Sequence, residues 1–68
     1  MNIRELSGMT YKSIELEHST ATSISEVLAE LAHWFRRNEI RGYITSVVTE
    51  SHPDDDHKFL TVVVWADH

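Results

Sequence analysis

The segment from Phe59 to Ala66 constrains the fold most, because it has the pattern of a strand with two apolar faces. Successive side chains of a strand point to opposite sides of the sheet. The odd-numbered side chains share one face and the even-numbered ones the other: Phe59, Thr61, Val63 and Trp65, then Leu60, Val62, Val64 and Ala66. A single helix can cover only one face of a small sheet. The second face therefore predicts another subunit or a bound ligand.

Chain size and charge narrow the class of protein. A chain of 68 residues forms one domain that buries only about 60% of its unfolded surface, so it usually relies on disulfides, metal or oligomerisation. The chain has no cysteine, which leaves out disulfides and fits a reducing cytoplasm. Its net charge of -5 argues against nucleic acid or anionic membranes as partners, and no apolar run is long enough to span a bilayer. We expect a cytoplasmic homo-oligomer.

The segment after Ser23 predicts a helix. Ser23 and Glu26 have the spacing of a capping box, in which each satisfies a free amide of the first turn. Apolar residues then recur at the spacing of one helical face, namely Ile24, Val27, Leu28, Leu31 and Phe35, with Ala32 and Trp34 at the margins. Gly42 is expected to supply the left-handed turn that ends the segment. The helix should run from about Ile24 to Asn38.

Three further segments have the composition and alternation of strands: 10–17, 43–49 and 59–66. Residues 50–58 are polar and are expected to form the connection of a hairpin. The predicted fold is α+β with β-α-β-β order: a three-stranded antiparallel sheet in the spatial order one, three, two, with one helix across one face. Residues 1–9 are expected to form an N-terminal arm or a short extra strand, and residues 10–68 the domain.

The predicted first strand and helix start resemble dodecins. The resemblance rests on the run Tyr11-Lys12-Ser13-Ile14-Glu15-Leu16, followed by Ser19, Thr22 and Ser23 at the helix start. It continues more loosely through Ile40-Arg41 and Val47-Val48 into the last strand, and leaves out the first eight residues. Dodecins are small β-α-β-β proteins that assemble into hollow dodecamers and commonly bind flavins. The resemblance implies a homo-oligomer with room for a small planar ligand between subunits.

The flavin-contacting residues of dodecins are not matched. The tryptophan that stacks on the flavin ring aligns with Ile44, beside Tyr43, and the glutamine that binds its edge aligns with Leu60. Isoleucine has no aromatic face, and leucine cannot hydrogen-bond the polar edge of a flavin. The cofactor is therefore unknown, with flavin implied by resemblance alone. The residues expected to contact a ligand are Tyr43, Ile44, Ser46, Leu60 and Val62.

The run His52-Pro53-Asp54-Asp55-Asp56-His57 is a second candidate site. Imidazole suits zinc, copper or nickel, and carboxylates suit harder cations. The candidate metal ligands are His52, Asp54, Asp56 and His57. The alternative is a solvated hairpin turn, in which proline and aspartate are favoured by turn geometry.

Catalysis has little support in the sequence. The chain lacks a cysteine nucleophile, a glycine-rich phosphate loop and a serine elbow, so we expect no enzyme. Three hypotheses remain for its function. The first is an oligomeric, dodecin-like binding or sequestration protein that assembles through the open sheet face. The others are a small adaptor or inhibitor of a partner protein and a metal-binding protein that uses the loop from His52 to His57.

Overall fold

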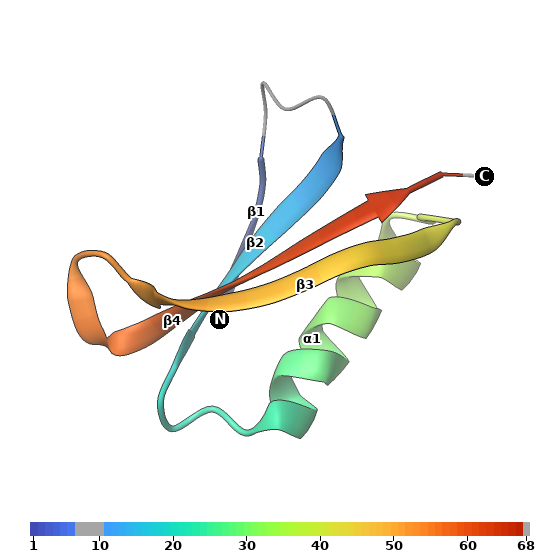
Figure 1. The fold of residues 1–68 in the computed structure, drawn as a ribbon. Coiled ribbons are helices and arrows are strands. Elements are labelled where there is room, and N and C mark those ends of the chain that lie inside the picture. The colour runs from blue at the N-terminus through green and yellow to red at the C-terminus, as the bar shows by residue number, and fades with distance from the viewer. Residues whose placement is uncertain (7–10, 68) are drawn as a thin grey trace.

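The computed structural model, which describes residues 1–6 and 11–67, has an α+β fold with one helix and a four-stranded antiparallel sheet (Figure 1). The sheet order is β1-β2-β4-β3. The elements are β1 (Asn2–Glu5), β2 (Lys12–Ser19), α1 (Ile24–Arg37), β3 (Tyr43–His52) and β4 (Asp55–Ala66). Within the described part of the chain, no helix is long and apolar enough to cross a membrane.

The three strands expected from the sequence keep their expected neighbours, because β4 lies between β2 and β3. The expected count of three was wrong, since Asn2–Glu5 adds β1 to the sheet by pairing antiparallel with β2. The fourth strand is short, and Ile3 is its one apolar residue, so its pattern could not decide between the two expected alternatives, an arm and a short extra strand. The expected boundary between arm and domain, at residues 9 and 10, lies outside the described residues, as does Thr10 of the expected first strand.

The hairpin of β3 and β4 is longer than its sequence indicates. The register pairs Glu50 with Leu60 and His52 with Asp55, so only Pro53 and Asp54 form the turn. The expectation that residues 50–58 form a polar connection was therefore wrong. Most of these side chains are exposed, so their polarity reflects solvent contact rather than the absence of a strand. Figure 1 shows the hairpin turn projecting well beyond the helix.

The helix begins where the sequence predicts. The Ser23 hydroxyl accepts the amide hydrogen of Glu26 at 3.2 Å, as expected for the N-cap. The return contact differs from the expected capping box, because the Glu26 carboxylate accepts from the Ser23 hydroxyl at 3.1 Å. Arg36 and Arg37 lie in the last turn, where positive charge complements the helix dipole.

The helix ends at Arg37, five residues before Gly42, and the left-handed turn that follows it is formed by Glu39, whose φ is 54°. The Glu39 amide donates to the Arg36 carbonyl, and the Ile40 amide donates to the Phe35 carbonyl, each at 3.1 Å. This is the hydrogen-bond pattern of a Schellman motif, with Glu39 in the position that usually holds glycine. The expectation that Gly42 ends the helix was therefore wrong.

Glu39→Gly is expected to stabilise the protein. A left-handed conformation costs a side-chain-bearing residue about 1 kcal/mol, whereas glycine adopts it freely. Part of that gain is offset by the larger entropy of glycine in the unfolded chain, so we expect about 0.5 kcal/mol or more. Thermal and urea unfolding measure the change. Glu39→Ala is the control: it removes the same charge but keeps the strained conformation, so a similar gain in that variant would contradict the explanation.

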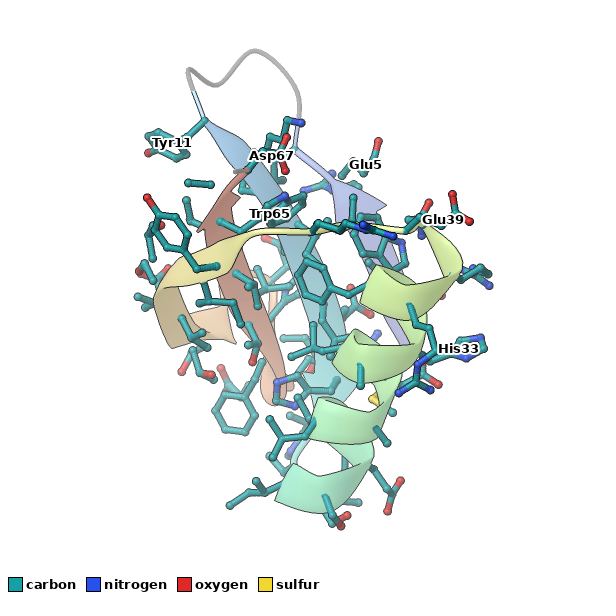
Figure 2. All side chains as sticks on the ribbon, turned by 90° about the vertical axis from the view of Figure 1, so that its right-hand side faces the viewer. Glu5, Tyr11, His33, Glu39, Trp65 and Asp67 are labelled. Atoms are coloured by element: carbon teal, nitrogen blue, oxygen red, sulfur yellow. The ribbon has the colours of Figure 1, made fainter. Side chains whose placement is uncertain are left out.

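The core lies between α1 and one face of the sheet. Its buried apolar residues are Ile14, Leu16, Leu31, Trp34, Val63 and Trp65. Trp65 lies beside the C-terminal end of α1 (Figure 2). Its ring contacts those of Phe35 and Trp34 edge-on, with 5.1 and 5.9 Å between the ring centroids. These aromatic contacts rotate the helix so that Trp34, expected at the margin of the apolar stripe, is buried. Ile24 and Leu28, expected on the apolar stripe, are 80% and 59% exposed.

Candidate functional site

The open face of the sheet, which points away from α1, carries the residues that the sequence singled out for assembly. The register aligns its side chains in rows across β2, β4 and β3. The rows are Ser13, Val64 and Ser46, then Glu15, Val62 and Val48, then Glu17, Leu60 and Glu50. In each row the β4 residue is apolar, while the β2 residue is polar or charged. The open face therefore divides lengthwise into an apolar half and a polar half.

The apolar half, which we call the open-face strip, consists of Ser46, Val48, Leu60, Val62 and Val64. Val48 is 47% exposed, and the three β4 residues are partly buried. The strip holds no charged side chain, although Glu50 lies at its end beside Leu60. Such a surface can contact another apolar surface or a flat ligand, but it offers few groups for acid–base chemistry.

The polar half of the open face is neutralised by ion pairs. Arg4 of β1 contacts Glu15 at 3.2 Å, and Lys58 of β4 contacts Glu17 at 3.2 Å. The Nε2 atom of His52 lies 3.6 Å from the second carboxylate oxygen of Glu17. Neither basic partner was predicted, because the segment of Arg4 was left as an arm or a short extra strand with no pairing assigned, and Lys58 was expected in a loop. These pairs keep the carboxylates of β2 from forming an unbalanced negative patch.

The structure brings together most of the expected ligand-contacting residues. Ser46, Leu60 and Val62 all lie on the open-face strip, in successive rows with Val62 in the middle one, and Tyr43 lies opposite Ala66 at the end of the same face. Ile44 lies on the other face, because it is the register partner of the buried Trp65. A β-bulge between Ile44 and Ser46 inserts one residue and changes the face. Ile44 there borders a cavity of 260 Å³ beside Trp65.

The expected metal ligands lie around the turn of the β3–β4 hairpin. The Nδ1 atom of His52 accepts the amide hydrogen of Asp54 at 3.0 Å, and its Nε2 faces Glu17. The carboxylate of Asp55 accepts the amide hydrogen of His57 at 2.9 Å. In the part of the chain that the structure describes, no three His, Asp or Glu side chains are grouped to hold an ion. Metal binding by His52, Asp54, Asp56 and His57 remains a prediction.

The exposure of β3 distinguishes it from every other long strand. All its residues from Tyr43 to Ser51 are exposed, on both faces of the sheet. The helix does not cover this edge, and the other side of β3 has no neighbouring strand in the described chain. Four large side chains of β3 are roughly half exposed as a result: Tyr43, Ile44, Val47 and Val48.

Comparison of the chain with family models, with curated proteins and with solved structures found no match in any of the three.

Proposed function

We propose that this protein is a non-enzymatic, homo-oligomeric binding protein of the dodecin type, whose copies assemble through the open-face strip. The exposure of the open face of β3 carries the proposal, because Tyr43 and Val48 are 58% and 47% exposed there and lie beside the apolar β4 residues of the strip. Contiguous apolar surface of this kind is disfavoured on a monomer and is typical of an interface. The resemblance of the segment from Tyr11 to Ser23 to dodecins supports the same reading.

A second copy of the chain is the favoured occupant of the strip. The domain is small and has no cysteine, so an oligomer is its readiest source of additional stability. The net charge of -5 would oppose self-association, but Arg4 and Lys58 balance the β2 carboxylates of the open face, Glu15 and Glu17. Two strips can therefore meet without bringing unpaired carboxylates of β2 together.

A ligand between subunits would be planar and mainly apolar. The strip offers Val48, Val62 and Val64 for contact and one hydroxyl, that of Ser46, for a hydrogen bond. Leu60 and Ile44 stand where the flavin-contacting residues of dodecins align, and neither supplies that chemistry. An apolar ring system fits this surface better than flavin does. The absence of cysteine favours the cytoplasm as the compartment.

Native mass spectrometry of the untagged protein tests the proposal. We expect one discrete oligomer, and a visible colour after purification would accompany it if a chromophore is retained. A colourless oligomer would support assembly without a chromophore. A bare monomer at micromolar concentration would contradict the proposal and favour the adaptor or inhibitor hypothesis, which requires a partner protein.

A further inference from the structure

A groove lies on the opposite side of the sheet from the open-face strip, between the N-terminal half of α1 and the β3–β4 hairpin. Its volume is 340 Å³. Most of its walls are apolar, formed by Val27, Leu28 and Leu31 of α1, Val47 of β3 and Phe59 of β4. Among the residues that the structure describes, no Lys, Arg, Asp or Glu lines it. Since a buried charge without a partner is costly, the groove favours an uncharged occupant.

Three hydrogen-bonding side chains form a chain along one side of the groove. Thr61 is only 3% exposed, and its hydroxyl oxygen lies 2.7 Å from Nε2 of His18 and 2.8 Å from the hydroxyl oxygen of Thr49. Thr49 is exposed and lines the groove, so its hydroxyl is the accessible end of the chain. A hydroxyl has one donor and two acceptor positions, and the contact with Thr61 uses only one of them. Thr49 can therefore bond an additional polar group.

The described residues do not fix the direction of this hydrogen-bond chain. The Nδ1 atom of His18 is buried and has no hydrogen-bond partner among residues 1–6 and 11–67. A partner at that atom is what ordinarily selects the tautomer of a histidine. Without one, Nε2 can donate to Thr61 or accept from it, and Thr49 can correspondingly donate or accept toward the groove. A ligand hydroxyl, which also does both, can pair with Thr49 in either direction.

We infer that this groove binds a small, uncharged, apolar molecule with one hydroxyl group. The hydroxyl bonds to Thr49, and the hydrocarbon portion lies against Val47, Leu28 and Phe59. A cavity of about 150 Å³ is enough for benzene, so a groove of 340 Å³ suits a molecule of roughly two fused rings. The open-face strip lies on the other side of the sheet, so this site is independent of the proposed assembly.

Isothermal titration of the untagged, full-length protein with 2-naphthol and naphthalene tests the site. We expect both to bind, and Thr49→Val to weaken 2-naphthol about five- to tenfold, the worth of one hydrogen bond, while naphthalene affinity stays unchanged. Thr45→Val is the matched control: it makes the same change on the same strand outside the groove, and should leave both affinities unchanged. Naphthalene-2-carboxylate, which is charged, should bind more weakly than 2-naphthol.

A second variant tests the apolar wall. Val47→Glu places a carboxylate in the groove and should abolish binding of both uncharged probes, with native mass and far-UV circular dichroism confirming a folded protein. Three results would overturn the inference. These are failure of the wild type to bind 2-naphthol, equal loss of both probes in Thr49→Val, and retained binding in folded Val47→Glu. Because probe binding and native mass are read separately, failure of the site is distinguishable from failure of the proposed assembly.

Discussion

Val48→Glu is expected to dissociate the oligomer into folded monomers, whereas Val47→Glu is expected to leave the mass of the oligomer unchanged. The two residues are adjacent on β3 and lie on opposite faces of the sheet, Val48 beside Val62 and Val47 beside Val63. In the proposed assembly only Val48 is covered by another copy. A carboxylate buried there without a partner costs about 3 kcal/mol or more, which weakens the interface at least about a hundredfold.

This pair of variants is well matched, because the two side chains have similar exposure in the isolated chain. Val48 is 47% exposed and Val47 is 54% exposed, so neither substitution buries a charge within the monomer. Both variants make the same chemical change on the same strand. A difference between them in native mass spectrometry or light scattering therefore reports which face forms the interface.

The reverse result would refute the proposed interface. If Val47→Glu dissociated and Val48→Glu stayed assembled, the helix side of β3 would be the contact surface, and the groove beside α1 would be filled by another subunit. If neither variant dissociated, β3 would lie outside the interface altogether. Circular dichroism on each variant separates dissociation from unfolding.

Local sequence signals predicted the elements best. The helix start at Ile24 was correct, because Ser23 and Glu26 lie within one turn of each other and their contact needs no other part of the chain. The order of β2, β4 and β3 was also predicted, because the two apolar faces of 59–66 require a central strand. In both cases a single local feature of the sequence, the helix cap or the two apolar faces, is enough to determine the structure.

The errors concern features that tertiary contacts determine. β1 was predicted only as one of two alternatives, an arm or a short extra strand, because its pairing with β2, rather than its own pattern, makes it a strand. Ile44 was expected on the open face, but the bulge at residue 45 moves it to the helix side, and no residue in the segment marks that bulge. The burial of Trp34 was likewise not predicted, because it results from the contact of the Trp34 ring with that of Trp65 across the core.

Of the two candidate sites, one was predicted from local sequence pattern, and the other depends on tertiary contacts and was not predicted. The open-face strip was largely predicted, since alternation along β4 assigns Leu60, Val62 and Val64 to one side. The hydrogen-bond chain of the groove had no signal in the sequence. His18 and Thr61 are 43 positions apart, and only the register of β2 on β4 brings them together. A histidine and two threonines carry no motif that would have linked them in advance.

Gly42→Ala is expected to be the most destabilising single substitution outside the core. Gly42 has a φ of 132°, a conformation that side-chain-bearing residues rarely adopt. An added Cβ would overlap the carbonyl oxygen of Ala66 and stand 3.0 Å from its carbonyl carbon. Both atoms belong to the backbone of β4, so no side-chain rotation can relieve the overlap. Strain and displacement together should cost about 2 to 4 kcal/mol.

Thermal unfolding followed by circular dichroism measures this loss, which corresponds to a fall of roughly 10 °C or more for a domain of this size. Arg41→Ala, which shortens the neighbouring exposed side chain, is the control and should change stability by no more than about 0.5 kcal/mol. Ala66→Gly should not rescue Gly42→Ala, because the overlap involves the main chain of residue 66. Rescue by that second change, or wild-type stability of Gly42→Ala, would contradict the close approach of Gly42 to β4 that sets where β3 begins.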